Sequence, residues 1–514
     1  MADETVQTGG DQQADRRVKL DRLRDEFGID PFGRRVDGLA PIAEARGRYD
    51  AAADAAAKEN AEDDRRPVVK VAGRVMLHRD IGRLVFMTIR DGTGDLQIAV
   101  SKKAVAEEVF KLAKLTDLGD IVVARGPLGT TKTGEVTIWA GDGEDAAGFG
   151  IATKSLAPPP EKWHGLQDAE LRYRRRYVDL YVNPEVRETF ELRSRIVKRI
   201  RDFLTDPPAG LGPGFLEVET PMMQPQAGGA AARPFVTHHN ALDMQLYLRI
   251  APELYLKRLL VGGLHRVFEI NRNFRNEGID RNHLPEFTML ELYQAFGDYH
   301  SMMALSEQLI HTLAMELVGS AIVRFDEQDI DCSLPFRRAR YHELFAEHAG
   351  FGSDDVERVA GLAREAGVET EGKDHELILK DVWEHVVEPH LVQPTFVMDY
   401  PAEMCPLTKR KADDPSVAER VQLYFAHMEL VNAYTELNDP DVQATNFSSQ
   451  IGGLDDEEQT FRATDEDFLE ALRVGMPPAG GLGIGIDRLV MLLTGQRSIR
   501  DVILFPLMRA GDGE

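Results

Sequence analysis

The chain has 514 residues, of which 43% are hydrophobic and 29% are charged, and its formal net charge is −25. This length predicts two or three domains, each large enough for its own core. No membrane-spanning helix and no secretory signal are expected, because the sequence has neither a long apolar run nor an apolar segment close to residue 1. Cys332 and Cys405 are the only cysteines, which argues against a disulfide framework or a cysteine zinc site and fits a reducing cytoplasm.

The acidic total argues against a nucleic-acid partner, but the charge is unevenly distributed. Residues 67–150 contain 11 Lys and Arg against 11 Asp and Glu, so this segment is neutral. A neutral module can still present one basic face, while the acidic remainder would repel RNA elsewhere. The charge pattern therefore leaves room for one nucleic-acid-binding module.

Residues 1–66 are polar and include an alanine-rich, acidic tract at 49–64. This composition predicts an N-terminal extension with one or two helices. Two interpretations stay open for it, a partly disordered leader and a defined arm that contacts RNA.

Residues 67–152 contain short strand-like runs separated by turn signals, with Asp91-Gly92 and Gly94-Asp95 marking one hairpin. Five strands are expected, with one helix near 104–115 between the third and the fourth. This order is typical of a small OB barrel, which binds single-stranded nucleic acid by stacking bases on aromatic side chains. Phe86 is a candidate stacking residue and Gln97 a candidate reader of base edges, although a core role for Phe86 alone is equally compatible with the pattern.

A proline-rich tract predicts a linker at 153–168, and alternating helix and strand patterns follow from 169 to 514. A long helix is expected at 183–204, because Asn183 is suited to the cap and Pro184 to the first turn. The segment 214–223 is expected to form a strand.

Residues 272–293 predict a strand, a polar loop and a second strand. Four residues of the second strand fall at alternate positions and share one face: Phe287, Met289, Glu291 and Tyr293. Arg275, at the end of the first strand, offers a planar fork for phosphate or carboxylate, and Glu277, two residues later, can accept from an amine. From these residues alone, a surface hairpin with a solvated charge cluster is an equally good interpretation.

Two later segments contain further candidate site residues. Residues 420–440 predict another strand pair, in which Asn432, Tyr434 and Glu436 share one face. In 480–495, glycines alternate before Arg488 at a predicted helix start. That run fits neither the Rossmann spacing nor a P-loop, and alone it is a weak phosphate signal.

The motif FRNEG followed by HLPEFTMLELY resembles the second signature motif of class II aminoacyl-tRNA synthetases. Its residues resemble those of the lysine-specific branch of that family. Segments 183–223 and 480–495 resemble the first and third motifs of the same family. The resemblance spans roughly 67 to 509 in order. It implies an α+β fold, in which an N-terminal OB barrel that binds the anticodon (67–152) precedes a catalytic domain (169–514) whose antiparallel sheet is flanked by helices. It also implies a homodimer built through the first motif.

The resemblance implies activation of L-lysine with ATP and Mg²⁺, followed by transfer to tRNA(Lys). The expected catalytic residues are Arg275 and Arg488. The expected lysine contacts are Gly229, Glu253, Arg275, Glu291, Tyr293, Asn432, Tyr434 and Glu436. The expected ATP contacts are Arg275, Glu277, His283, Phe287, Glu429 and Arg488. The expected metal ligands are Glu429 and, weakly, Gln422. The expected anticodon contacts are Phe86, Gln97 and Glu135.

Two positions depart from the family pattern. Leu284 stands where the family has asparagine, which puts ATP affinity or loop order in question. Gln422 stands where the family has a carboxylate, which leaves an uncharged oxygen for the metal. Two alternatives therefore stay open: a paralogue that gives lysyl-adenylate to another acceptor, and an RNA-binding paralogue with impaired catalysis. The barrel argues against the first, and the retained Arg275, Glu277, Glu429 and Arg488 argue against the second.

Overall fold

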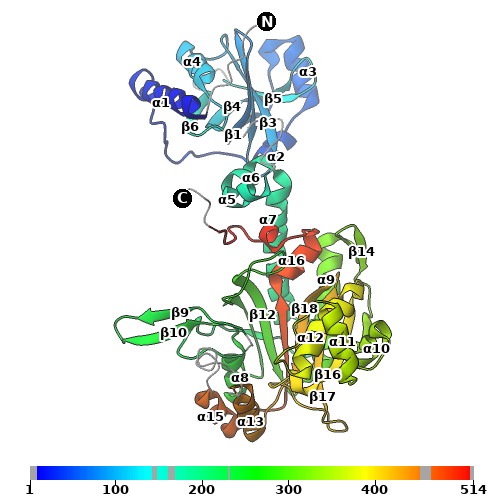
Figure 1. The fold of residues 1–514 in the computed structure, drawn as a ribbon. Helices are drawn as coiled ribbons and strands as arrows, with labels where there is room; N and C mark the ends of the chain where they lie inside the picture. Colours follow the sequence, from blue (N-terminus) through cyan, green and yellow to red (C-terminus); the bar gives the residue numbers. More distant parts are fainter. Residues whose placement is uncertain (1–8, 142–147, 160–167, 230–231, 452–464, 510–514) are drawn as a thin grey trace. The chain divides into compact units, whose positions relative to one another are not determined.

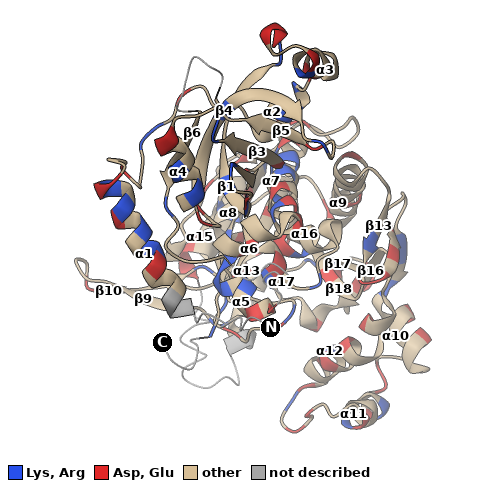
Figure 2. Cartoon of the chain, turned by 90° about the horizontal axis from the view of Figure 1, so that it is seen from above, with Lys and Arg blue, Asp and Glu red and all other residues tan. Residues whose placement is uncertain are grey.

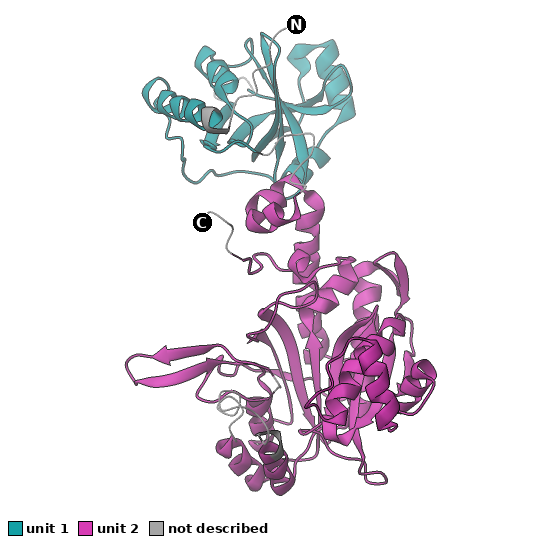
Figure 3. Cartoon of the chain, viewed as in Figure 1, with its two compact units in different colours: residues 1–167 teal, residues 168–514 magenta. Residues whose placement is uncertain are grey.

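The computed structural model describes residues 9–141, 148–159, 168–229, 232–451 and 465–509. Contacts divide the chain into two compact units, residues 1–167 and 168–514 (Figure 3). No helix in the described ranges combines the length and the apolar composition that a membrane span requires.

Unit 1 is built on a six-stranded barrel (Figure 1). Its strands are β1 (Val68–Asp80), β2 (Leu84–Arg90), β3 (Asp95–Ser101), β4 (Ile121–Thr130), β5 (Val136–Trp139) and β6 (Phe149–Thr153). The order is β1-β2-β3-β5-β4-β6, and a further pairing of β1 with β4 closes the barrel. The helix α4 (Glu107–Leu115) lies between the third and fourth strands, as predicted. The predicted number of strands was one too low, because residues 149–153 form a sixth strand, β6, which pairs with β4.

The N-terminal extension packs on this barrel. It forms α1 (Gly9–Asp25), α2 (Ile42–Gly47), α3 (Ala51–Glu59) and the short helix η1 (Ala61–Asp63). Leu23, Ile42 and Ala45 belong to the barrel's own hydrophobic core, so the described part of this extension is a defined layer. Figure 2 shows charges of both signs along α1.

Unit 2 contains an eight-stranded sheet. In sheet order its strands are β15 (Arg337–Arg340), β16 (Thr395–Pro401), β17 (Val417–Phe425), β18 (Met428–Thr435), β19 (Ala479–Gly485), β12 (Glu286–Ala295), β11 (Arg266–Phe274) and β7 (Leu216–Glu217). All neighbours are antiparallel except the two outer pairs. The strand predicted at 214–223 is much shorter than expected. Only β7 and β8 (Met223–Gln224) form there, and Pro221, which cannot donate to a strand ladder, lies between them.

One face of this sheet is covered by α7 (Pro184–Thr205), α9 (Tyr299–Leu313) and α16 (Ile486–Thr494), which bury the largest core with the inward residues of the strands. The helices α10 (Tyr341–Ala349), α11 (Val356–Glu365) and α12 (His375–Val386) have a core of their own. The other helices are α5 (Ala169–Arg174), α6 (Arg176–Val182), α8 (Glu253–Val261), η2 (Ala314–Val318), η3 (Glu388–His390), η4 (Ala402–Met404), α13 (Pro440–Ile451), α15 (Glu466–Gly475) and α17 (Ile499–Val502). The remaining strands are β9 (Val236–His239), β10 (Met244–Leu248), β13 (Ile322–Phe325) and β14 (Gln328–Asp331).

Candidate active site

The candidate site of unit 2 lies on the sheet face opposite the largest core. The strand β19 runs between β12 and β18, and its glycines stand beside polar residues of both neighbours. Gly481 pairs with Tyr293 and Tyr434, and Gly483 with Glu291 and Asn432. Paired residues point to the same face of a sheet, so the glycines leave a floor without side chains between two polar walls. The intervening residues Leu482 and Ile484 face the core.

One end of this floor holds three charged groups. The carboxylate of Glu436 fills the space above Gly481, where a Cβ would lie 1.8 Å from Glu436 Oε1. Lys257, from α8, donates to Glu436 Oε2 at 2.5 Å and to Glu253 Oε1 at 2.6 Å. Lys257 is fully buried and Glu436 is 1% exposed. The pocket thus contains a lysine ammonium of the chain itself, which the sequence analysis did not include among the site residues.

Glu291 and Tyr293 form the adjacent wall. Both are buried, and the Tyr293 hydroxyl donates to Glu291 Oε2 at 3.3 Å. Burial raises the pKa of Glu291 to about 8, and the charge of Glu253 adds to this effect. At neutral pH the Glu291 carboxyl is therefore largely protonated, and it regains its charge only when a cation comes near. Gly229 lies beside Glu253 with a φ of +87°, a conformation that favours glycine.

Arg275 follows directly after β11 and stacks its guanidinium on the ring of Phe287, 5.1 Å from the centroid. Its Nε is buried, and it has no hydrogen-bond partner among the described residues. A guanidinium held on an aromatic face with an unused donor is well placed for an oxyanion. Glu277, two residues later, is exposed in the loop.

Arg488 lies in the first turn of α16 and is held by two contacts. Its Nη1 donates to the backbone oxygen of Glu429 at 2.6 Å, and its Nη2 lies 2.7 Å from His283 Nε2. Since arginine can only donate, this His283 nitrogen must accept, and the proton sits on Nδ1, 2.8 Å from Asp280 Oδ2. Asp280, His283 and Arg488 therefore form a hydrogen-bonded chain that fixes the His283 ring beside the guanidinium.

A β-bulge sets the direction of Glu429. The pairing of β17 with β18 runs from Leu423 opposite Val431 to Tyr424 opposite Glu429, so Leu430 is an extra residue. The shift places Glu429 on the face shared by Gln422 and Asn432. Without the bulge, the odd spacing of Glu429 and Asn432 would put them on opposite faces.

The residues expected to hold a metal have unequal geometry. Glu429 is partly exposed, whereas Gln422 is 6% exposed and its Oε1 accepts from the Tyr424 hydroxyl at 3.2 Å. The same hydroxyl lies 3.0 Å from Glu388 Oε1. Among the described residues, no group of three His, Cys, Asp or Glu side chains could hold a metal. Glu429 therefore fits a cation brought in by phosphates, and the engaged amide of Gln422 fits one poorly.

The candidate nucleic-acid face of unit 1 lies on the outside of the barrel. Phe86 alternates with the buried Val85 and Met87, so it is outside the barrel core. Ala99 pairs with both Phe86 and Trp139, whose rings meet edge to face at 6.4 Å. Gln97 Nε2 donates to Thr137 Oγ1 at 2.8 Å, and Glu135 is exposed. Phe86, Gln97, Glu135 and Trp139 therefore line one surface, whereas Thr137 on the same face is buried.

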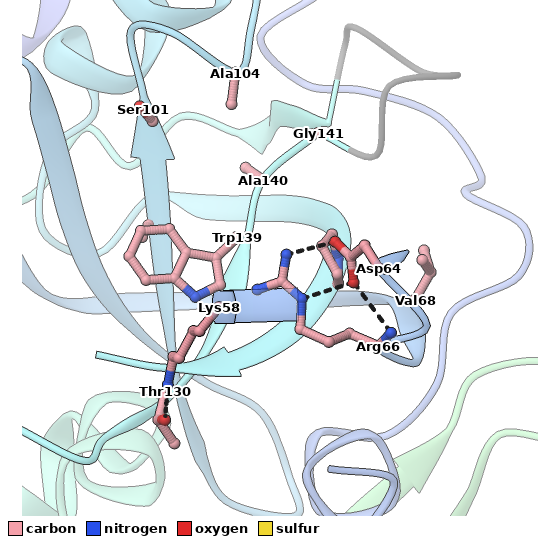
Figure 4. A pocket seen from close by; sticks show the side chains of 12 residues that line it. Lys58, Asp64, Arg66, Val68, Ser101, Ala104, Thr130, Trp139, Ala140 and Gly141 are labelled. Carbon is pink, nitrogen blue, oxygen red and sulfur yellow. Dashed lines mark hydrogen bonds and ion pairs between the residues drawn. The ribbon is translucent and has the colours of Figure 1, made fainter. Parts of the chain in front are cut away.

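A cavity of about 520 Å³ borders this surface (Figure 4). Trp139, Ser101 and Thr130 line it, together with Lys58 and Arg66 of the extension. Trp139 was missed in the sequence analysis, although its alternation with Glu135 and Thr137 places it on the same face.

Comparisons with known proteins found matches to both units. Residues 168–509 match the family model of class II tRNA synthetases (D, K and N), and residues 69–145 match the OB-fold nucleic acid binding domain. A lysine--tRNA ligase of Pelotomaculum thermopropionicum is 51% identical over 500 residues, covering 96% of this chain and 94% of its own length. Those of Carboxydothermus hydrogenoformans and Moorella thermoacetica are 49% and 45% identical and cover 96% and 98% of this chain, and 98% and 99% of their own lengths.

The chain belongs to the lysine--tRNA ligase family. The sequence-based predictions of family, α+β fold and ATP-dependent ligase are thereby confirmed. Members of this family act with ATP on lysine and tRNA(Lys). The chain contains the synthetase module and a nucleic-acid-binding module.

The structure changes the interpretation of one departure from the family pattern. Leu284 is 5% exposed and belongs to the largest core. Its side chain packs into that core, which favours an ordered loop, and its effect on ATP affinity stays a prediction. His283, the neighbour that faces Arg488, keeps the polar role in this loop.

Proposed function

We propose that this chain joins the carboxylate of L-lysine to the α-phosphorus of ATP and then transfers the lysyl group to the terminal adenosine of tRNA(Lys). The choice of lysine rests on one observation. The carboxylates of Glu253 and Glu436 lie together at one end of the pocket, where Glu436 and the neighbouring Tyr293 are buried. Lys257 carries one positive charge beside two carboxylates, so a cationic side chain can satisfy the remaining negative charge and an uncharged analogue cannot. Hydrogen-bonding sites can reject an analogue that leaves a partner unsatisfied by about 10⁴-fold.

In the first step a lysine carboxylate oxygen attacks the α-phosphorus, and the bond to the bridging oxygen of pyrophosphate breaks. The chain need supply no nucleophile, so positioning and charge neutralisation carry the catalysis. We assign Arg275 to the α-phosphate and the lysine carboxylate. Two features support this assignment: its Nε has no hydrogen-bond partner among the described residues, and its guanidinium lies over the ring of Phe287. We assign Gly229 and Glu253 to the α-ammonium, and Glu436 to the ε-ammonium with Tyr293 beside it.

Asn432 and Tyr434 complete the lysine wall in this proposal. Arg420 donates to Asn432 Oδ1 at 3.2 Å and lies over the ring of Tyr434. It thereby fixes both side chains. The Glu291 carboxyl would lose its proton and become negatively charged as the lysine ammonium enters.

We assign the remaining polar groups to ATP. Arg488 and His283 would receive the outer phosphates, and Glu277 would accept from the adenine amine. Phe287, beneath Arg275, offers an aromatic face beside the nucleotide. Mg²⁺ carried by the ATP would neutralise phosphate charge, with Glu429 as its ligand and Gln422 as a weak one.

For tRNA(Lys), we assign the anticodon to the barrel face. Phe86 would stack a base, and Gln97 and Glu135 would contact base edges. We also propose a homodimer through α7 and β7. The edge position of β7 and the 52% exposure of Leu216 support this proposal. A cytoplasmic location is supported by Cys332 and Cys405, both free and buried.

Pyrophosphate exchange into ATP tests the proposed function. Exchange should require lysine, and aspartate and asparagine should not replace it. Robust exchange with either of those amino acids and none with lysine would overturn the assignment of the pocket.

A further inference from the structure

Lys257 is a buried lysine whose ammonium lies between two carboxylates. It lies one helical turn after Glu253 in α8, and its side chain is completely buried. Its Nζ contacts Glu253 at 2.6 Å, Glu436 at 2.5 Å and the face of Tyr293, 6.0 Å from the ring centroid. All three neighbours belong to the proposed lysine pocket. A buried ammonium is costly unless it is fully paired, so Lys257 depends on both carboxylates.

The carboxylates depend on Lys257 in turn. Glu253 and Glu436 approach the same nitrogen, so their contacting oxygens are no more than about 5 Å apart. Like charges at this distance repel strongly in a dry pocket. Burial raises the pKa of Glu436, Lys257 opposes that rise, and Glu253 adds to it. Without the Lys257 ammonium, the two carboxylates would separate or one would take up a proton.

Pairing with Lys257 uses one oxygen of each carboxylate. The other oxygen of Glu436, Oε1, lies above the bare floor at Gly481. The proposed substrate carries one ammonium on Cα and the other at the end of its side chain, so a fixed number of methylene groups separates its two charges. A pocket that holds two carboxylates at a fixed spacing can therefore measure that length.

We propose that Lys257 is a specificity-determining positioning residue, which fixes the spacing of Glu253 and Glu436 and so makes the pocket select lysine over a diamino acid that is one methylene shorter. The inference rests on the proposed function, because it assigns the two ammonium groups to those two carboxylates. Lys257 itself contacts neither ammonium group of the substrate in this arrangement.

The test is pyrophosphate exchange with lysine and with ornithine, in the full chain and in Lys257→Met, which keeps the length of the side chain without its charge. We expect the lysine KM to rise and the preference for lysine over ornithine in kcat/KM to fall by at least about tenfold, the size of a one-methylene discrimination. The KM for ATP should stay unchanged. A folded Lys257→Met protein with wild-type preference would overturn the proposal.

Lys154 supplies a matched control. It is also fully buried and paired to two carboxylates, Asp117 at 2.6 Å and Asp120 at 2.9 Å, but in unit 1. Lys154→Met should lower the melting temperature and leave the preference for lysine unchanged. A loss of preference in both variants would attribute the effect to general destabilisation and overturn the proposal.

Lys257→Arg keeps the inference testable if Lys257→Met does not fold. It retains the charge but changes the distance that the cation spans, so the lysine-to-ornithine ratio should still move while the KM for ATP does not. A ratio equal to that of the wild type would overturn the proposal. Absence of lysine-dependent exchange in the wild-type chain would instead refute the proposed function, so the two failures are distinguishable.

Discussion

Gly481 leaves the space that the carboxylate of Glu436 occupies. A Cβ at Gly481 would lie 1.8 Å from Glu436 Oε1 and 2.7 Å from Tyr293 Cε1. Both distances are far below van der Waals contact. The strand pairing places Gly481 between Tyr293 and Tyr434, so no other position for the new methyl group exists without moving a pocket wall. The alternating glycines thus make room for acids and phenols.

Gly481→Ala should therefore abolish lysine-dependent exchange by displacing Glu436. Gly485→Ala, in the same strand, is the control, because its Cβ would meet Arg488 Cδ at an ordinary 3.7 Å. The measurements are exchange rate and melting temperature for both variants. Near-normal exchange in Gly481→Ala would show that Glu436 does not need its present position.

Glu291 should make stability depend on pH. Its folded pKa of about 8 lies above its ordinary value of 4.5. The unfolded chain therefore releases the Glu291 proton first, and the stability contributed by the protonated group is lost as pH rises from about 4.5 to about 8. Glu291→Gln should remove this part of the pH dependence and melt higher than wild type at the alkaline end. Equal pH dependence in both proteins would contradict the burial argument.

The same group predicts proton release on lysine binding. An incoming ammonium favours the charged form of Glu291, so the pocket should lose a proton as lysine enters. Calorimetry in two buffers of different ionisation enthalpy measures this release near neutral pH. Glu291→Gln should release fewer protons per lysine bound than wild type, whereas equal release would place the titrating group elsewhere.

Several features of the site could be predicted from the sequence because they depend on local periodicity. The alternation of Glu291 with Tyr293, and of Asn432 with Tyr434, identified residues that share a face before any fold was known. The i,i+4 spacing of Glu253 and Lys257 also allows their pair to be expected.

Other features depend on contacts that local spacing does not encode. Glu436 meets Lys257 across 179 positions of sequence, from the end of β18 to the middle of α8. The bulge at Leu430 appears only in the register of two paired strands. Leu284 packs into the largest core, and the sequence does not say which loop residue turns there.

The barrel face yields a prediction for Phe86 and Trp139. If both stack bases of the tRNA, Phe86→Ala and Trp139→Ala should each weaken aminoacylation by about 1–3 kcal/mol while adenylate formation stays intact. The comparison of pyrophosphate exchange with tRNA charging separates binding from folding. Equal losses in both assays would show that the edge-to-face pair of rings only stabilises the barrel.

Arg275 should not tolerate replacement by lysine. Its guanidinium stacks on Phe287 and keeps its Nε unpartnered among the described residues, and a lysine supplies neither the planar stack nor the fork. Arg275→Lys and Arg275→Ala should both lose exchange in a folded protein. Arg488→Ala should also lose exchange, with the added effect of freeing His283. If any of these variants retained exchange, the role proposed for the replaced arginine would be wrong.

The last prediction concerns Gln422, where the family pattern has a carboxylate. Its amide oxygen is buried and accepts from Tyr424, whose hydroxyl also lies beside Glu388. An amide in this position brings no charge to Mg²⁺. We therefore expect exchange to require more Mg²⁺ than in relatives with a carboxylate, and Gln422→Glu to lower that requirement. In the absence of Mg²⁺, Gln422→Glu should melt lower than wild type, because the new charge lies close to Glu388 and Glu429.

A magnesium titration of exchange, combined with melting curves with and without the ion, checks both parts of this expectation. Tyr424→Phe is the control, because it releases the amide of Gln422 without adding charge. An unchanged magnesium dependence in Gln422→Glu would mean that this position does not limit metal binding. Absence of turnover in every form at every magnesium concentration would favour the alternative of an RNA-binding paralogue that has lost synthetase activity.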